Sequence, residues 1–497
     1  MNYISIKNGE SIAVNSVPVL NYQEFYNVFD LLKDHENHCI NYFAVNEADT
    51  IRLWAMIAND REHTIYVFSS NVAHNSKLKS LTPKYPGMHV YEREIAEVFH
   101  LQFEESEWDK PLRFPFNRNN KEQTIEKYPF YSIESHELHE VGVGPIHAGI
   151  IEPGHFRFIC NGEKVLHLEI QLGYQHRGVE SLMIQNQNIT YQTKLAESIS
   201  GDTVIGNTLA FASLIESLNG KSMSTSVEIE RAIALELERI AIHTGDLSAL
   251  CTDVAYQFGT VVFQDLRTII INTFLQWCGN RFARKLIHPQ MNKYPLTQEL
   301  KEKILNNLAE YESRFHEMTQ LMFNIPSVLA RFENVGVVTT QQALDMMFVG
   351  MAARTSGVER DIRKSHPHGF YQHTAIDPVV LKNGDVKARA QLRYFEIVAS
   401  LKYIKEWLQL HSSSEKIAHS NNKLMPNSLC LTLVEGWRGE LCHVALTDAK
   451  GNIMHYKIKD PSLHNWFALA LAVRNNDISD FPICNKSFDL SYCGFDL

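Results

Sequence analysis

The sequence predicts an α+β protein in which a small N-terminal α/β domain precedes a large, mainly helical domain with peripheral β-hairpins. In the first domain, the β-branched and aromatic run Thr64–Val72 indicates a strand, and Tyr91–Phe103 places apolar residues at helical spacing. From about residue 182 to 402, apolar residues recur with a helical period. Because 497 residues exceed the ~100–200 of a typical domain, we expect domains at 1–120 and 121–497.

Short local signals predict the domain boundary and the hairpins. Residues 117–127 read NRNNKEQTIEK, a polar stretch typical of a linker or surface segment. Asn161-Gly162 lies between two alternating runs within His155–Gly173, which strongly favours a hairpin turn. Lys450-Gly451 marks a turn in a second β-like region near the C-terminus. We therefore expect the strands of the larger domain to form hairpins around its helices.

The composition argues against several classes of function. A net charge of -10 argues against nucleic acid as a partner, because phosphate recognition needs a basic surface. No apolar run approaches the ~20 residues that span a bilayer, and no signal-peptide pattern is visible, so we expect membrane association only through partner subunits. The eight cysteines include no C-x-x-C pair. This argues against a disulfide framework, a zinc site or a cluster, and most of these thiols are expected to be buried.

Two glycine-containing motifs place polar side chains at turns. These side chains are His147, Glu152 and His155 in GPIHAGIIEPGHFRF (144–158), and His176 and Arg177 in LGYQHRGVES (172–181). Taken alone, the first motif predicts a structural loop that leads into a strand, and the second predicts the start of a helix.

In this order, and together with ELERIAIHTGDLSAL (236–250) and the segment Gly336–Tyr371, the two motifs resemble a known family. It is the large subunit of energy-converting, membrane-bound nickel–iron hydrogenases of the formate hydrogenlyase type, and the motifs also resemble the homologous quinone-site subunit of complex I. Upstream, SLTPKYPGMHVYEREIAEVFHLQF and PLRFP resemble the small complex I subunit that is fused to the large one in several such enzymes. The resemblance covers nearly the whole chain and implies a hydrogenase-large-subunit-like second domain.

The positions that hold the metals in this family lack their thiolates. By resemblance, Ser200 and Thr203 stand at the first cysteine pair and Ser491 and Gly494 at the second, with Cys493 out of register by one. Nickel and low-spin iron need soft thiolate ligands, whereas hydroxyl groups are hard donors that stay protonated. We therefore expect no metal at these positions and no hydrogen activation. The sequence stops three residues after Gly494, so no processed tail is expected either.

The resemblance also assigns catalytic roles, most of them with a structural alternative. Glu152 matches the hydrogenase glutamate that passes protons, the alternative being a loop carboxylate. His155 is a substitute for a missing proton donor to quinone. Arg354 lines the family's cavity beside a cluster, while Asp361 and Arg363 form either part of that cavity or a structural ion pair.

Further residues are assigned to the side of a cofactor or acceptor by the same resemblance. They are His147, His176, Arg177, Ser200, Thr203 and Cys493. The pair His366 and His368 is expected in a surface turn rather than at a metal, and Trp466 in the core rather than against a cofactor.

The function implied is that of a peripheral subunit on the cytoplasmic side of the cell membrane. Electrons would pass from the 4Fe–4S cluster of a small partner subunit to a quinone or another small acceptor, coupled to proton or ion movement. Ferredoxin-like and antiporter-like membrane subunits are the other partners implied, and this chain alone is expected to bind no cofactor. Activity is expected only within such a complex. The alternatives are a non-catalytic scaffold that couples other subunits, and an unusual metal centre that uses Cys493.

Overall fold

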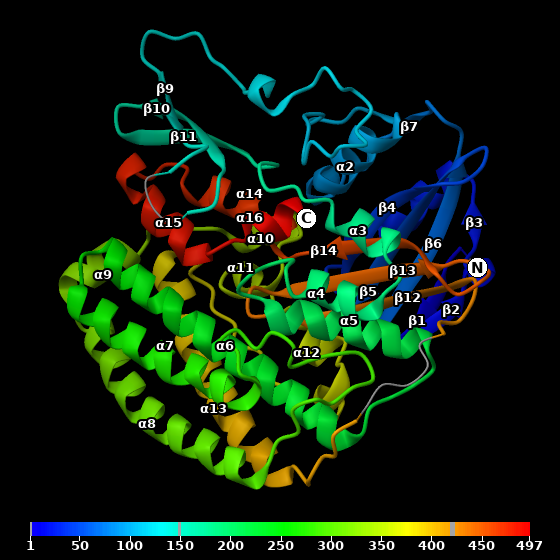
Figure 1. Ribbon diagram of the computed structural model, residues 1–497. Helices are drawn as coiled ribbons and strands as arrows, with labels where there is room; N and C mark the ends of the chain where they lie inside the picture. The colour runs from blue at the N-terminus through cyan, green and yellow to red at the C-terminus, as the bar shows by residue number, and fades with distance from the viewer. Residues whose placement is uncertain (1, 148–150, 418–422) are drawn as a thin grey trace.

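The computed structural model describes residues 2–147, 151–417 and 423–497 (Figure 1). The predicted mixture of helices and strands in an α+β arrangement is confirmed. The expected strand Thr64–Val72 is β6, with the same bounds. The expected helix at 91–103 is α2, His89–Phe99, which ends early because His100 adopts a left-handed conformation with φ of 53°.

The N-terminal sheet is built from antiparallel neighbours in the order β1-β6-β5-β4, and β3 adds to β6 in parallel. Its remaining strands are β1 (Ile4–Ile6), β3 (Val19–Leu20), β4 (Asn37–Asn46) and β5 (Ile51–Asn59). On one face, Phe25 of α1 (Tyr22–Val28) packs against Tyr42 and Phe68. The short strands β7 (Lys77–Lys79) and β8 (Gln102–Glu104) pair beside this sheet.

A second sheet, in the order β14-β13-β12-β2, forms a central layer of the molecule. Its strands are β2 (Ser11–Ala13), β12 (Ser428–Glu435), β13 (Glu440–Thr447) and β14 (Ile453–Lys459). Every residue of β12 and β13 is buried. Leu431 and Val444 pack against Trp54 and Met56 of the first sheet, because both sheets turn apolar faces toward each other. Helix α5 (Val204–Leu218) covers the opposite face.

Long helices lie side by side below this layer (Figure 1). They are α6 (Thr225–Asp253), α7 (Gln257–Cys278), α8 (Gln298–Phe323) and α13 (Val386–Leu410). The shorter helices are α3 (Val179–Gln185), α4 (Ile189–Ala196), α9 (Pro326–Phe332), α10 (Thr340–Asp345), α11 (Gly350–Arg354) and α12 (Ile362–Ser365). Of these, α3 packs against β14, α4 against α5 and α12 against β12. In α6 even Glu230, Glu236 and Glu238 are buried, so its polar side chains serve the interior as well as the surface. No described helix is long and apolar enough to cross a membrane.

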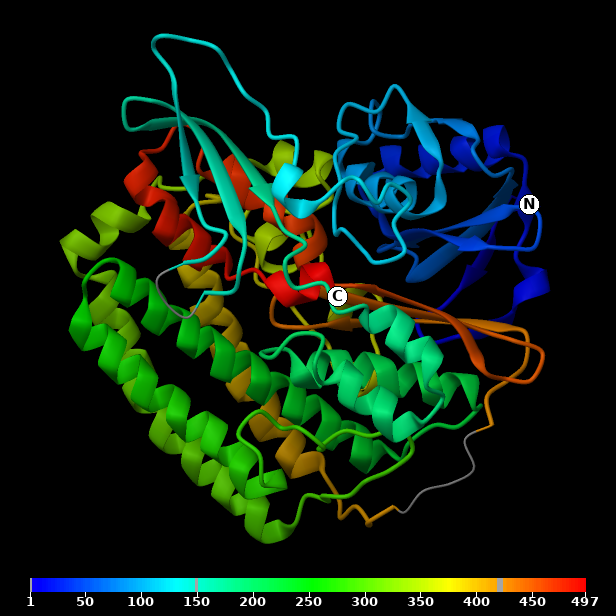
Figure 2. The same ribbon diagram turned by 45° about the horizontal axis from the view of Figure 1, so that its top comes forward.

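A third sheet, in the order β11-β10-β9, projects from the body of the protein (Figure 2). Its strands are β9 (His139–Val143), β10 (His155–Asn161) and β11 (Lys164–Gln171). Strands β10 and β11 pair across Asn161-Gly162, which confirms the predicted hairpin. Helices α14 (Ser462–Ala472), α15 (Phe481–Phe488) and α16 (Tyr492–Asp496) lie beneath this sheet.

Candidate functional site

The positions that the resemblance assigns to the two cysteine pairs lie together, although the two pairs are far apart in sequence. Ser200 and Thr203 precede α5, and Ser491 caps α16 by accepting a hydrogen bond from Gly494 N at 2.9 Å. The Oγ atoms of Ser200 and Ser491 are 3.0 Å apart. Because Ser200 donates to Asp202 Oδ1 at 2.6 Å, the hydrogen between the two serines comes from Ser491. The two serine hydroxyl groups therefore join the segment before α5 to the start of α16.

Arg438, which the sequence motifs did not single out, lies at the centre of this cluster. Its guanidinium donates to both oxygens of Asp202, at 2.7 and 2.6 Å, and also to Thr203 Oγ1 at 3.2 Å. Its guanidinium carbon lies 4.0 Å from the centroid of the Trp437 ring. Burial opposes ionisation of Asp202, but Arg438 outweighs it and keeps the pKa of this carboxyl below its usual value. A bidentate ion pair thus joins the hydroxyl groups.

A carboxylate lies where the fourth cysteine would project. A Cβ on Gly494 would lie 2.6 Å from Asp460 Oδ2, which has no hydrogen-bond partner among the described residues. Burial raises the pKa of Asp460, against the opposing charge of Arg438. Cys493 Sγ lies 3.5 Å from Ser491 Oγ, and burial raises the pKa of this thiol. Cys493 is therefore a protonated, inert thiol at neutral pH rather than a thiolate ligand.

Glu152 lies at the edge of the cluster, as the resemblance implied. Its Oε2 accepts a hydrogen bond from Cys493 N at 3.4 Å, and its side chain is only partly buried. The two histidines of the same motif brace the loop: His147 Nε2 donates to Gly154 O at 2.9 Å, and His155 Nδ1 donates to Gly144 O at 3.1 Å. Residues 148–150 of this motif lie outside the described part of the chain.

His176 and Arg177 fasten the end of the chain beside the cluster. His176 Nδ1 donates to Asp496 O at 2.8 Å, and burial lowers the pKa of this ring. Arg177 donates to Ser198 O at 2.7 Å and, through its main-chain N–H, to Leu497 O at 2.9 Å. Both side chains therefore position the segments that carry Ser200 and Cys493.

Arg354, Asp361 and Arg363 form part of a buried ion network. Arg354 donates to Glu435 Oε1 at 2.7 Å and to Glu396 Oε1 at 2.5 Å. Arg363 donates to Asp361 at 3.0 Å through Nε and at 2.6 Å through Nη2. The geometry favours the structural ion pair for Asp361 and Arg363, because their charged atoms pair with one another in the interior.

This network supports the turn that carries Arg438. Arg239 donates to Glu435 O at 2.9 Å and to Gly436 O at 3.1 Å, and it lies 3.0 Å from Glu236. Arg354, Asp361 and Arg363 thus act on the cluster through the backbone between β12 and β13 rather than by direct contact.

His366 and His368 are buried, so the expectation of a surface turn was wrong. His366 Nε2 lies 3.3 Å from Asp60 Oδ1, and Asp60 Oδ2 lies 3.3 Å from His38 Nδ1. His368 packs against Tyr371, with ring centroids 5.0 Å apart. His366 lies in the interior because Asp60, a carboxylate of the N-terminal domain, contacts it there. Across the described segments, no group of three acidic, histidine or cysteine side chains is arranged to hold a metal ion.

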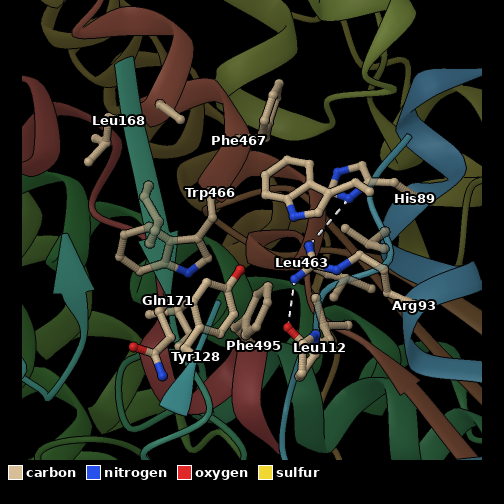
Figure 3. Close-up of a pocket in the computed structure, with 16 residues that line it drawn as sticks. His89, Arg93, Leu112, Tyr128, Leu168, Gln171, Leu463, Trp466, Phe467 and Phe495 are labelled. Atoms are coloured by element: carbon tan, nitrogen blue, oxygen red, sulfur yellow. Dashed lines mark hydrogen bonds between the residues drawn. The ribbon is translucent and has the colours of Figure 1, made fainter. Parts of the chain in front are cut away.

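The cysteines and Trp466 lie in the core, as predicted: all eight thiols are buried, and the Trp466 side chain is 4% exposed. Trp466 borders a cavity of about 40 Å³ beside His89, Arg93 and Tyr128 (Figure 3). This volume admits about one or two water molecules. The cavity beside Trp466 is therefore too small for an aromatic cofactor.

The fold and this cluster define a class of protein: a large-subunit scaffold of the hydrogenase and complex I type, joined to a small N-terminal domain. Residues 253–496 match the family model "Respiratory-chain NADH dehydrogenase, 49 Kd subunit", and residues 19–122 match "Respiratory-chain NADH dehydrogenase, 30 Kd subunit". The chain is thus a fusion of a complex I 30 kDa domain with a complex I 49 kDa domain.

Curated relatives include both hydrogenases and complex I subunits. The chain is 27% identical to the carbon monoxide-induced hydrogenase of Rhodospirillum rubrum, over 70% of this chain and 96% of the relative. It is 24% identical to formate hydrogenlyase subunit 5 of Escherichia coli, over 84% and 77%. It is 27% identical to NADH-quinone oxidoreductase subunit 4 of Thermus thermophilus, over 71% and 92%.

A solved structure shares the fold. A chain in the structure of a membrane-bound sulfane sulfur reductase, an archaeal respiratory membrane complex, superposes with a TM-score of 0.68 at 20% identity. The match covers 74% of this chain and 100% of that chain.

Proposed function

We propose that this chain is a peripheral subunit of a membrane-bound, respiratory-type redox complex. In this role it receives electrons from an iron–sulfur cluster in a partner subunit and delivers them, with protons, to a quinone or another small acceptor. The observation that supports this best is the position of Glu152, which accepts a hydrogen bond from Cys493 N at the edge of the cluster around Arg438 while remaining partly exposed.

The cluster supports proton delivery rather than metal chemistry. Its donors are hydroxyl groups, a guanidinium and carboxyl groups, which bind hard or hydrogen-bonding ligands and not soft metals. Reduction of a quinone to a quinol consumes two electrons and two protons. The electrons come from the partner's cluster, and the partly exposed Glu152 is the carboxyl group placed to pass the protons, because Asp202 is held as a carboxylate by Arg438.

Exposed apolar residues in the Glu152 motif and beside the His176 loop support a partner at this face. Ile146 is 90% exposed, Phe116 is 80% exposed and Ile151 is 47% exposed. The Phe116 ring lies 6.2 Å from the His176 ring, so this apolar residue lies beside the His176 loop. The partner in this proposal is the small iron–sulfur subunit. Ferredoxin-like and antiporter-like membrane subunits complete a complex on the cytoplasmic side of the membrane.

The test is turnover of the purified complex with a soluble quinone. Glu152→Gln removes the proton but keeps the shape of the side chain, so we expect donor oxidation to slow by about 10²-fold. Glu163→Gln, on an exposed hairpin turn, is the matched control and should leave the rate unchanged. Equal rates for both variants would contradict a role of Glu152 in proton transfer.

A non-catalytic scaffold is the second candidate, and the Arg438–Asp202 ion pair favours it because it joins the hydroxyl groups where metals would lie. The double variant Glu152→Gln with Asp202→Asn discriminates between the two. Intact ion transport and intact donor oxidation in a complex that carries both substitutions would establish the scaffold and exclude chemistry at this cluster.

A further inference from the structure

We propose that the groove between the two domains binds a small, uncharged, planar carbonyl compound. The groove has a volume of about 340 Å³, within the ~300–1,000 Å³ of small-molecule sites. The N-terminal domain lines it with Phe43 and Val98, and the large domain lines it with Ile184 and Met454. This site goes beyond the proposed function, which concerns the cluster around Arg438.

Arg113 supplies an unused hydrogen-bond donor to this groove. The side chain is 3% exposed; its Nε donates to Phe495 O at 2.7 Å, and its Nη1 pairs with Glu94. Its buried Nη2 has no partner among the described residues. Buried guanidinium N–H groups are almost always paired, so this N–H is available to an acceptor oxygen. A carbonyl oxygen would meet this requirement.

His455 and Phe43 supply a flat wall. Their rings stack with centroids 5.0 Å apart and an interplanar angle of 14°. Burial lowers the pKa of His455 to about 3, so the ring is neutral at pH 7, and its Nε2 has no partner within the described chain. Aromatic ligands stack on such a surface, and a polar substituent on the ligand would reach Nε2.

The charges in the groove are already matched, which sets the ligand's charge. Lys457 Nζ lies 2.6 Å from Glu94 and 3.2 Å from Glu180, and Arg113 also pairs with Glu94. The two cations thus face Glu94 and Glu180, while Glu97, the third acidic side chain that lines the groove, accepts hydrogen bonds from the main-chain N–H groups of Leu112, Arg113 and Phe114. An anionic ligand would meet Glu94 and Glu180 as well as Arg113, whereas an uncharged carbonyl compound needs only the free N–H.

The probe is 6-propionyl-2-(dimethylamino)naphthalene, an uncharged planar ketone whose emission shifts to the blue in apolar surroundings. Titration of the full chain should give saturable binding at one site. Ile184→Trp fills the groove and should weaken binding at least tenfold, whereas Leu321→Trp, at an exposed position of α8, should bind as the wild type does. The anionic probe 1-anilinonaphthalene-8-sulfonate should bind at least tenfold more weakly than the ketone.

Three results would overturn the proposal: no saturable binding by the wild type, equal binding by Ile184→Trp and wild type, or tighter binding of the sulfonate than of the ketone. Arg113→Met tests the donor directly and should lose the blue shift. Because Arg113 also holds Glu94, circular dichroism must show that this variant is folded; the Ile184→Trp comparison decides the matter if it is not.

Discussion

Asp460 and Gly494 share one small space: a Cβ on Gly494 would lie 2.6 Å from Asp460 Oδ2 and 2.7 Å from its carboxyl carbon. The position that the resemblance assigns to the fourth metal-binding cysteine therefore differs from a cysteine in two ways. Gly494 has no side chain, and the buried carboxyl group of Asp460, just before α14, lies where a side chain would project. A cysteine at position 494 would require Asp460 to move.

Gly494→Ala should lower the free energy of unfolding by about 1–3 kcal/mol, because the added methyl group overlaps Asp460 and Ser491. Urea denaturation provides the measurement. Gly201→Ala is the control, since a Cβ there meets nothing within 4 Å. Adding Asp460→Ser to Gly494→Ala should recover part of the loss; no recovery would argue against the overlap as its cause.

The ion pair of Asp202 with Arg438 should make stability depend on pH in the acid range. The folded pKa of Asp202 is lowered, so its contribution is fully present above the unfolded value of about 3.9 and is lost as the pH falls through the lower folded value. Asp202→Asn should cost about 1 kcal/mol or less at pH 7, because Asp202 is partly exposed. In urea titrations the stabilities of wild type and variant should converge as the pH falls through the folded pKa of Asp202; a difference that does not narrow on acidification would contradict the ion-pair contribution.

Arg354→Met should destabilise the protein strongly, by about 3–5 kcal/mol, because it leaves Glu396 and Glu435 without their buried cation. Chemical denaturation measures the change. Arg61→Met is the matched control: its pair with Glu36 at 3.0 Å is exposed, so we expect a change of about 0.5 kcal/mol at most. Comparable losses in the two variants would refute the network's structural role.

His38 should couple the joint between the domains to pH in the neutral range. Burial and Arg360 oppose its protonation, but Asp60 and Glu440 outweigh them, and the folded pKa lies above its usual value. The contribution is fully present below the unfolded value of about 6.5 and is lost as the pH rises through the folded one.

His38→Gln should therefore be less stable than the wild type at pH 6, and the difference should narrow by pH 9. Thermal unfolding across this range measures it, with the exposed His74→Gln as the control. A constant difference between pH 6 and pH 9 would show that the charge of His38 is not involved.

Local sequence patterns predicted the strand and the hairpin well, because neighbouring residues largely determine whether a segment forms a strand or a turn. The β-branched and aromatic residues of Thr64–Val72 located β6, and Asn161-Gly162 located the hairpin of β10 and β11. The convergence of Ser200 with Ser491 also followed, because family motifs carry the register of distant segments.

Arg438 and Asp460 could not be found in this way. Arg438 lies between β12 and β13, and its partner Asp202 is 236 positions away in the sequence. Asp460 follows β14, and its importance comes from the approach of Gly494, which lies beyond α14 and α15. The predicted location of His366 was wrong for the same reason, since its partner Asp60 belongs to the other domain. Partners brought together only by the tertiary fold leave no local spacing to detect.

The pairing of Ser11–Ala13 with Ser428–Cys430 has a consequence for biosynthesis. During synthesis, β2 leaves the ribosome long before its partner strand exists, and it must stay unpaired until β12 emerges. Strand β2 therefore takes its place in the sheet only after β12 has been synthesised. A fragment that begins at residue 121 would lack β2 and leave the edge of β12 open to another chain, so the two halves are expected to aggregate when expressed apart.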